Sequence, residues 1–236
     1  MKAKQIIIEI GADSLSFSVG KTTEPYDVNS SISMAANLRE AFDSVGLLED
    51  RYEKALVMAD SNIMLIPAED CGEDDLTTMY RHTFSDFSAS DIIVSTEMPD
   101  MSAIAVYTIN KDVNTVLSDH FPNVEFSPLG LPVWREMFRH NFTGTSKRLH
   151  AYFHDQKMEV FCFQQNRFRF FNTFVVAHAH DALYYLLYTW KQLAMNVEHD
   201  EMNLIGETEH KEWLAEHLKQ YLKRVQSAEC RVQIKV

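Results

Sequence analysis

The strongest constraint on the fold is an order of strand-type and helix-type hydrophobic patterns that occurs twice along the chain. Residues 5–19 alternate apolar and polar side chains on both sides of a turn at 11–13, a pattern typical of a β-hairpin. Residues 149–175 contain three successive strand-like runs joined by short polar turns. In both halves, helical patterns and further strands follow the opening strands. This order predicts two successive α/β units, with a boundary near residues 142–147.

The other elements follow from periodicity and from the turn residues that flank them. In the first half we expect helices at 33–45, 111–120 and 133–140, strands at 55–59, 63–67, 91–96, 104–109 and 124–127, and an acidic helix start at 73–75. In the second half we expect a helix over 179–194, a strand at 202–205, a helix over 213–225 and a last strand at 231–236. Gly46 directly follows the first helix, where glycine commonly serves as a C-cap.

Composition and charge restrict the class of protein. Of the 236 residues, 46% are hydrophobic and 24% charged, which is typical of a globular domain. The 34 acidic and 22 basic residues give a net charge of −12, which repels nucleic-acid phosphates and anionic lipid surfaces. No signal-peptide core or membrane-spanning run is evident, and three scattered cysteines form no metal-binding spacing. We therefore expect a cytoplasmic protein that neither binds nucleic acid nor inserts into a membrane.

Glycine is scarce, with seven residues and no GG or GxG pair. A Walker loop places glycines around GK[ST], and a dinucleotide-binding fold needs GxGxxG, because backbone must approach the phosphates without intervening side chains. Neither motif occurs in the chain. The sequence therefore excludes these two kinds of nucleotide site.

Three short segments carry a resemblance to a known superfamily. Residues 9–14 form the first hairpin turn, residues 150–156 form the corresponding turn of the second half, and residues 203–208 join a strand to the last helix. In this layout the chain resembles the actin-like ATPase superfamily of actin, sugar kinases and heat-shock chaperones, and it is nearest to pilus-assembly ATPase-like proteins. The resemblance implies a duplicated ribonuclease-H-like α/β fold, with lobes 1–143 and 144–236 that each contain a mixed sheet flanked by helices.

The same segments depart from the motifs of that superfamily. Its first hairpin carries Asp-x-Gly-[Ser/Thr], where this chain has Glu9-Ile-Gly11-Ala12 followed by Asp13 and Ser14. Its second hairpin carries another Asp-x-Gly, whereas residues 150–156 contain no glycine. Its adenosine motif ends in Gly-Gly, where this chain has Gly206-Glu207. Because a glycine permits close backbone approach and Glu207 adds bulk and negative charge, these changes predict weakened ATP binding.

The resemblance implies two alternative functions. We favour an uncharacterised bacterial family in which a degenerate fold works as a non-catalytic protein-interaction or scaffold module. Its partner would be another protein or a short peptide, bound in a groove of the first lobe or between the lobes. The alternative is an active Mg-ATP-binding ATPase or phosphotransferase, with catalytic carboxylates Glu9 and Asp13 and nucleotide contacts from Gly11, Ala12, Ser14, Gly206 and Glu207. A ribonuclease-H-like nuclease is disfavoured, because it needs converging carboxylates on a basic surface.

Two clusters around the start of the long second-half helix have alternative interpretations. His178 and His180 could ligate zinc, or a residue of this segment could cap the helix; no third ligand is evident, and we predict no metal site. Tyr184, Tyr185 and Tyr188 leave the leucine stripe of the helix on more than one side, which could create an exposed partner surface.

The strand over 167–175 and its neighbour also bear on function. Arg167 and Arg169 are expected on one strand face, opposite Phe168 and Phe170. They could hold an acidic segment, but we favour a solvated edge face. Cys162 lies in an apolar strand, where burial would raise its pKa and make it a poor nucleophile.

Overall fold

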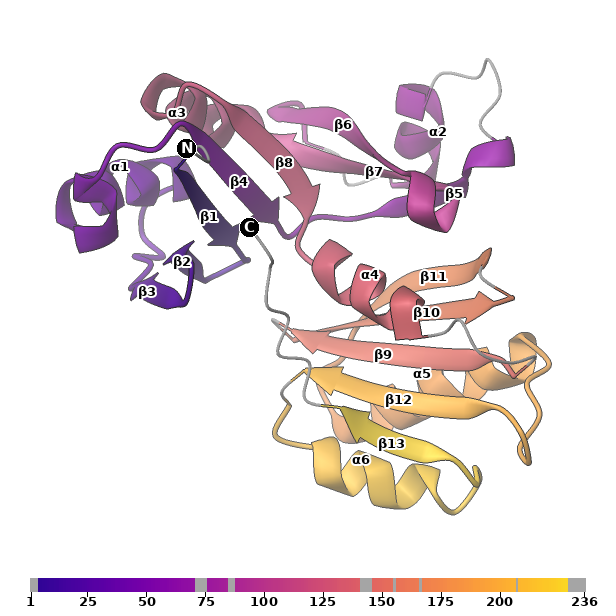
Figure 1. Cartoon of the computed structure of the whole chain (residues 1–236). Coiled ribbons are helices and arrows are strands. Elements are labelled where there is room, and N and C mark those ends of the chain that lie inside the picture. Colours follow the sequence, from indigo (N-terminus) through magenta and orange to yellow (C-terminus); the bar gives the residue numbers. More distant parts are fainter. Residues whose placement is uncertain are drawn as a thin grey trace.

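The computed structural model describes residues 4–70, 76–84, 88–140, 146–154, 156–165, 167–206 and 208–228 (Figure 1). Within these ranges the strands form two five-stranded sheets and one three-stranded sheet. Figure 1 shows the two larger sheets in separate parts of the molecule, with α4 (Leu131–His140) between them. No helix in the described ranges is long and apolar enough to cross a membrane.

The first sheet has the strand order β3-β2-β1-β4-β8. Its members are β1 (Gln5–Ile10), β2 (Leu15–Val19), β3 (Thr22–Tyr26), β4 (Lys54–Ala59) and β8 (Val124–Pro128). Antiparallel hairpins join β1, β2 and β3, whereas β4 pairs in parallel with β1 and β8. The helices α1 (Met34–Ser44) and α3 (Lys111–His120) contribute to the core that buries Ile6, Ile8 and Ile10. The predicted hairpin is confirmed, because its alternating residues form the inner face of this sheet.

The end of α1 differs from the prediction. Val45 is the C-cap, with extended backbone and an N–H that donates to the carbonyl oxygen of Ala41 at 2.9 Å. Gly46 instead begins a 3-10 turn, Gly46–Glu49. The expected glycine C-cap was wrong, because the chain leaves the helix with extended backbone at a buried valine and needs no left-handed residue there.

A small antiparallel sheet with the order β5-β7-β6 is inserted in the chain between β4 and β8. Its strands are β5 (Met64–Pro67), β6 (Asp91–Met98) and β7 (Ala103–Asn110), and two 3-10 turns, Ala68–Asp70 and Pro99–Met101, lie between them in the sequence. The helix α2 (Leu76–Thr83) packs on this sheet through the buried ring of Tyr80. The acidic segment 73–75, expected to begin a helix, lies outside the described residues.

The second sheet has the order β11-β10-β9-β12-β13. Its members are β9 (Arg148–His154), β10 (Lys157–Gln164), β11 (Arg167–Val175), β12 (Glu201–Gly206) and β13 (Val225–Ala228). As in the first sheet, three strands are joined by antiparallel hairpins and two more pair in parallel. The helices α5 (Ala179–Gln192) and α6 (Lys211–Leu218) pack into its core. The two sheets therefore repeat one topology, as the sequence pattern predicts, while the exact division at 143/144 stays a prediction.

The last helix is shorter than predicted. The helix expected over 213–225 ends at Leu218, and Val225 begins β13, where it pairs with Met202 of β12. Pairing with an existing strand overrides the helical spacing of the apolar residues at this point. The strand expected at 231–236 lies outside the described residues.

A β-bulge in the β10–β11 pair changes the expected faces of β11. The register shifts between Cys162 and Phe163, so that Phe170 pairs with Cys162 and Phe168 pairs with Phe163. Phe168 then packs in the core beside α4, and Phe170 packs in the core beside α5. The prediction that Phe168 and Phe170 share one face was wrong, because the inserted residue reverses the alternation.

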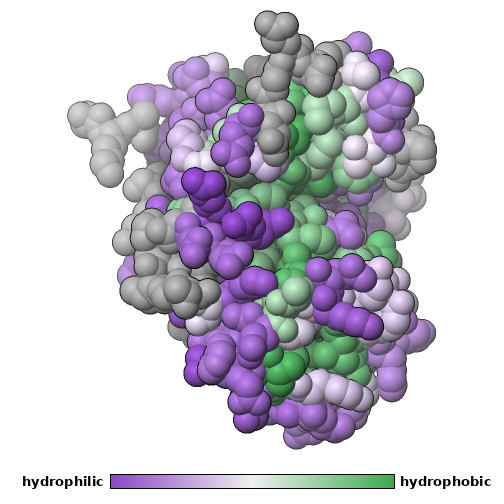
Figure 2. Space-filling model, turned by 90° about the vertical axis from the view of Figure 1, so that its right-hand side faces the viewer, coloured by the Kyte–Doolittle hydropathy of each residue, from purple (hydrophilic) through white to green (hydrophobic). Residues whose placement is uncertain are grey.

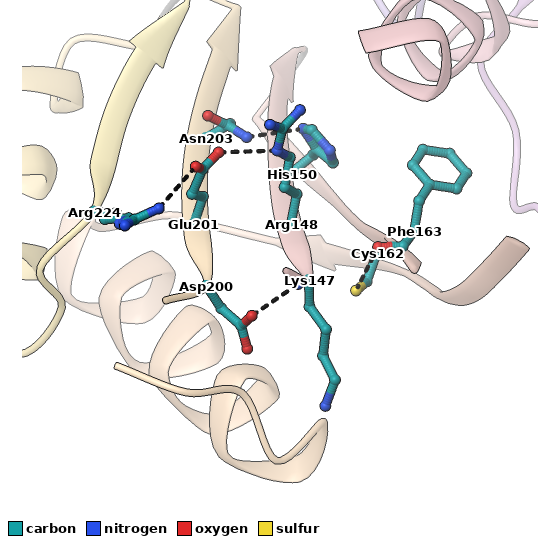
Figure 3. Close-up of polar contacts among 9 residues, drawn as sticks. All are labelled: Lys147, Arg148, His150, Cys162, Phe163, Asp200, Glu201, Asn203 and Arg224. Atoms are coloured by element: carbon teal, nitrogen blue, oxygen red, sulfur yellow. Dashed lines mark hydrogen bonds and ion pairs between the residues drawn. The ribbon is translucent and has the colours of Figure 1, made fainter. Parts of the chain in front are cut away.

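Ion pairs and a hydrogen bond of charged side chains connect the parallel strands of the second sheet (Figure 3). The guanidinium Nε of Arg148 lies 2.9 Å from one carboxylate oxygen of Glu201, whose other oxygen lies 3.5 Å from Arg224. The backbone N–H of Lys147 donates to the carboxylate of Asp200 at 2.7 Å. Neighbouring ends of β9, β12 and β13 are thereby held together.

His150 lies in the same sheet, fully inside the protein. Its Nδ1 is 3.4 Å from the amide nitrogen of Asn203 (Figure 3), and its ring stacks on Phe161. Burial, with a smaller effect from the charge of Arg148, lowers the pKa of His150 to about 3. The residue is therefore a neutral structural imidazole.

Candidate ligand cleft

A cleft of about 710 Å³ lies between the first hairpin and the second sheet. In Figure 1 the C-terminal ends of β1 and β9 both face the middle of the molecule, beside the start of α4. The cleft is lined by residues of these three elements, of β2, β3 and β4, and of the connecting loops: Glu9, Gly11, Asp13, Ser14, Leu15, Ser16, Pro25, Tyr26, Asp27, Val28, Met58, Leu129, Pro132, Val133, Tyr152 and His154. A space of this size accommodates a small molecule or several side chains of a peptide.

The first hairpin brings most of its predicted site residues to this cleft. Glu9, Gly11, Asp13 and Ser14 all line it, whereas Ala12 is exposed beside it and does not. The turn closes through a hydrogen bond from the N–H of Gly11 to the carbonyl oxygen of Ser14 at 2.9 Å. The hairpin prediction therefore places these groups together, and Asp13 and Ser14 remain exposed to solvent.

Glu9 occupies the outer face of β1, opposite the isoleucines that enter the core. Its carboxylate is half-buried and accepts a hydrogen bond of 3.3 Å from the hydroxyl of Ser16 on β2. Glu9 pairs in the sheet with Met58 of β4, which also lines the cleft. The charge of Glu9 therefore lies at the cleft surface.

The charge of the lining is negative. Glu9, Asp13 and Asp27 line the cleft, and no lysine or arginine is found among its described lining residues. Apolar side chains such as Leu129 and Val133 also line the cleft, together with uncharged polar ones such as Ser16. Phosphate groups would meet carboxylates here without a compensating basic side chain.

An ion pair joins the first sheet to the second hairpin. The ammonium group of Lys157, the first residue of β10, lies 2.6 Å from the carboxylate of Asp60, which directly follows β4. Asp60 is nearly buried, with 7% of its side chain exposed, and its N–H donates to the carbonyl oxygen of Ile10. This pair links residues 97 positions apart and was not identified from the sequence, because no local spacing signals it.

A buried carboxylate lies behind the cleft. Glu159 of β10 is 2% exposed and accepts a hydrogen bond of 2.7 Å from the indole N–H of Trp134 in α4. Its other oxygen lies 3.2 Å from Nε2 of His154, which lines the cleft. A Cβ at Gly130 would lie 2.1 Å from Glu159, so glycine is required at the start of α4. Sequence analysis missed this cluster, which ties α4 to β9 and β10.

Gly206, predicted to contact nucleotide, has a structural reason to be glycine. Its φ is +82°, and a Cβ would lie 2.3 Å from the carbonyl oxygen of Phe153 on the paired strand β9. Gly206 does not line the cleft, and Glu207 lies outside the described residues. A smaller pocket of about 390 Å³ beside it is lined by Thr208, His210, Lys157 and, shared with the cleft, His154.

The remaining candidate groups have structural roles. His178 is the N-cap of α5, and its backbone N–H donates to the carboxylate of Asp181 at 3.2 Å, as expected from the capping alternative. No group of three or more potential metal-ligating residues occurs in the described part of the chain. Burial raises the pKa of Cys162 to about 12, as predicted, while Cys71 and Cys230 lie outside the described residues.

The tyrosines of α5 divide between surface and core. Tyr184 and Tyr188 are exposed and stack on each other, with ring centroids 6.0 Å apart. Tyr185 instead stacks on Phe174 of β11 at 4.4 Å and is half-buried. On the face of the molecule that Figure 2 shows, apolar residues form a band bordered by polar ones. An apolar surface of this kind is common on monomeric proteins and does not by itself identify a ligand.

A family model described as a protein of unknown function (DUF3822) matches residues 1–225. No match was found to a protein of curated description.

Two solved structures are similar over nearly the whole chain. The first is a Bacteroides thetaiotaomicron protein described as having an actin-like ATPase fold and unknown function. It is 26% identical, with a TM-score of 0.85, and the match covers 96% of this chain and 92% of that one. The second, from a PilM–PilN type IV pilus biogenesis complex, is 9% identical with a TM-score of 0.61, covering 97% and 89%. The predicted actin-like ATPase fold is therefore confirmed.

Proposed function

Since the chain belongs to the DUF3822 family of unknown function and has the actin-like ATPase fold, we propose that it is a non-catalytic protein-interaction module. The module receives a segment of a partner protein in the cleft between the two larger sheets. The observation that carries this proposal is the chemistry of that cleft, which combines three carboxylates with apolar side chains.

The charge of the cleft supports a peptide over a nucleotide. Glu9, Asp13 and Asp27 repel the negative charge of a triphosphate, and the described lining offers no lysine or arginine to compensate it. A peptide gains instead from apolar side chains such as Leu129 and Val133 and from positive charge opposite the carboxylates.

The Asp60–Lys157 pair also supports a non-catalytic role. Lys157 stands at the second hairpin, where the superfamily has a phosphate motif, and its charge is already compensated by a nearly buried carboxylate. A phosphate at this hairpin would have to compete with Asp60 for the ammonium group. The glycine at 206 follows from its contact with Phe153, so it adds no support for adenosine binding.

The PilM–PilN complex provides an analogy for the partner. The PilM fold is similar to this chain, and that protein forms a complex with a second protein. By analogy, the fold of this chain would serve to bind a segment of another protein rather than to hydrolyse a nucleotide.

A titration with Mg-ATP and with ADP tests the proposal. We expect neither heat nor a rise in melting temperature at millimolar nucleotide, because any ligand of the native state must raise its stability. The alternative, an active ATPase, is favoured by the convergence of Glu9, Asp13 and Ser14 on one cleft. Micromolar binding that Ser14→Arg abolishes and Ser44→Arg preserves would overturn the proposal, since exposed Ser44 at the end of α1 does not line the cleft.

The same two variants test the positive part of the proposal. A partner cross-linked to the wild-type chain should be lost with Ser14→Arg, which fills the cleft, and retained with Ser44→Arg. Partner capture that both variants retain would exclude the cleft as the interaction site.

A further inference from the structure

The strand β11 differs from the other edge strands of the described sheets. An open sheet edge can pair with a further strand, and proteins usually prevent this with short strands, prolines or charges. The edge strands β3, β8 and β5 have four or five residues and each contains a proline, and the described part of β13 has four residues. The edge strand β6 contains two acidic residues. β11 has nine residues, none of them proline or acidic, so its edge is the most open to an added strand.

The main chain of β11 presents hydrogen-bonding groups at this edge. The N–H of Val176 donates to the carbonyl oxygen of Gln156 at 3.1 Å, which fixes the hydrogen-bonded pairs of the β10–β11 register. Because these pairs alternate, the main-chain groups of residues 171, 173 and 175 point away from β10. The N–H of Thr173 accordingly donates to the side-chain oxygen of its neighbour Asn172, at 3.0 Å. Every second residue of this half of β11 can therefore bond to a further strand.

The start of β11 carries positive charge. Arg167 and Arg169 are both exposed, and neither forms an ion pair with a residue of the described ranges. The chain as a whole has a net charge of −12, so two adjacent uncompensated arginines are a local exception. Charge complementarity at this edge favours an acidic segment and disfavours a basic one.

Exposed aromatic rings adjoin the other half of the strand. Phe174 of β11 stacks on Tyr185 of α5, and the ring centroid of Tyr185 lies 5.5 Å from that of Tyr184. Tyr184 stacks in turn on Tyr188, and both rings are at least half exposed. Val175, at the end of the strand, is 73% exposed. A strand added beside β11 directs alternate side chains toward the α5 face of the sheet, where apolar ones would cover these rings.

We propose that the outer edge of β11 binds an extended acidic segment of a partner protein by strand addition. The main chain of the segment pairs with residues 171–175. Its carboxylates face Arg167 and Arg169, and its apolar side chains cover Tyr184 and Tyr188. None of these residues lines the cleft, so this is a second interaction surface and does not depend on the function proposed for the cleft.

Selection from a library of random nine-residue peptides tests the chemistry of the segment. The library is applied to the full chain carrying Ser14→Arg, which blocks the cleft, so that the retained peptides report on other surfaces. We expect enrichment of aspartate and glutamate together with β-branched and aromatic residues, which favour extended backbone. Retained peptides without acidic enrichment would overturn the proposal.

A proline at the edge tests whether the selected peptides add as a strand. Thr173→Pro removes an outward N–H without removing a bond to β10, and we expect it to weaken peptide binding at least about tenfold. Thr173→Ala is the matched control, because it keeps the N–H and should keep the affinity. Equal binding by the two variants would exclude strand addition at β11. Melting temperatures establish that both variants are folded; if Thr173→Pro is not, the charge variants and amide exchange decide.

Charge reversal tests the arginines. Arg167→Glu with Arg169→Glu should weaken binding of the acidic peptides about tenfold, because two attractions become repulsions. Selection on this variant should instead enrich basic peptides. Arg39→Glu with Arg51→Glu is the matched control: both arginines are exposed in the first half of the chain, and the change in net charge is the same. An equal effect of the two double variants would mean that only net charge matters and would overturn the proposal.

Amide hydrogen exchange distinguishes strand addition from other modes of binding. A bound acidic peptide should slow exchange at Phe171 and Val175, whereas Phe174, which already bonds to β10, should change little. Protection confined to other strands would overturn the proposal. So would a dimer in sedimentation that Thr173→Pro dissociates, since the edge would then pair with a second copy. Either result leaves the proposed function of the cleft standing, because that function is tested separately with Ser14→Arg and Ser44→Arg.

Discussion

At the residue scale, backbone conformation and packing can require a glycine at a position where the superfamily has a ligand-binding motif. Gly206 stands where the superfamily has its adenosine motif, but its left-handed backbone and its contact with Phe153 already require glycine. Gly20 also has a positive φ, of +62°, yet a Cβ there would meet no atom within 4 Å. A comparison of substitutions at these two positions therefore separates the free-energy cost of backbone strain from that of a steric clash.

We predict that Gly206→Ala destabilises the protein far more than Gly20→Ala. Gly20→Ala should cost about 1 kcal/mol of unfolding free energy, since only the left-handed conformation is strained. Gly206→Ala should cost about 3 kcal/mol or more, because the Cβ also displaces a paired strand. Urea unfolding of both variants measures the difference, and equal losses would contradict the steric argument.

The buried imidazole of His150 makes stability depend on pH. Its pKa is about 3 in the folded state and 6.5 when unfolded, so between these values the unfolded chain binds the additional proton. This group therefore leaves the free energy of unfolding unchanged above pH 6.5 and lowers it as the pH falls from 6.5 toward 3.

We predict that His150→Phe reduces the loss of stability between pH 6.5 and 4. The slope of the free energy of unfolding against pH should decrease by up to about 1.4 kcal/mol per pH unit, which corresponds to one proton. Urea midpoints at several pH values provide the measurement, with His82→Phe on the exposed side of α2 as the control. If the slopes of wild type and His150→Phe coincide, His150 is not the group that titrates.

The sequence predicted only part of the candidate cleft. Glu9, Asp13 and Ser14 were identified because a single hairpin brings them together, and hairpin pairing is local. Lys157 and Asp60 were not identified, because the two residues are 97 positions apart and their contact depends on how the two sheets pack against each other. Long-range contacts of this kind leave no periodic signal in the sequence.

At the scale of elements, agreement was best where hydrophobic spacing and turn residues coincide. The helix 111–120 and the strand 167–175 were predicted with the bounds that the structure shows. The end of the last helix was not predicted, because pairing of Val225 with β12 outweighs the helical pattern that continues through it. The β-bulge of β11 was missed as well, since one inserted residue does not interrupt the run of aromatic residues.

The helix α4 makes a buried polar contact with β10 through Trp134 and Glu159. We predict that Trp134→Phe costs about 1–3 kcal/mol beyond its packing loss, because the buried carboxylate of Glu159 loses the indole donor. Trp190→Phe is the matched control: the indole nitrogen of Trp190 is buried without a hydrogen-bond partner in the described residues. Chemical unfolding compares the two, and a smaller loss for Trp134→Phe would argue against the role of Glu159.

At the scale of the whole molecule, α4 and an ion pair are among the contacts that connect the sheets. α4 packs against the second sheet through Trp134 and Phe138, in a core shared with Phe161 and Phe163. The Asp60–Lys157 ion pair is another such contact, at the edge of the cleft. Together they fix the relative position of the two sides of the cleft in the structure.

A double-mutant cycle should reveal the strength of the ion pair. Lys157→Met should cost about 3 kcal/mol, because it leaves the nearly buried carboxylate of Asp60 unpaired. Adding Asp60→Asn should recover part of this loss. The exposed pair Lys223–Glu198, also at 2.6 Å, should show a coupling of only about 0.2–1 kcal/mol in the same unfolding assay. Equal couplings for the two pairs would mean that burial does not strengthen the link.

The strand order also determines when the cleft can exist during synthesis on the ribosome. The first sheet is complete once β8 has emerged at Pro128, whereas the second sheet begins with β9 at Arg148 and is completed by β13. Domains generally fold as units, N-terminal first, as the nascent chain leaves the exit tunnel. We therefore expect a nascent chain to present the folded carboxylate side of the cleft to chaperones and partners before Tyr152 and His154 complete its lining.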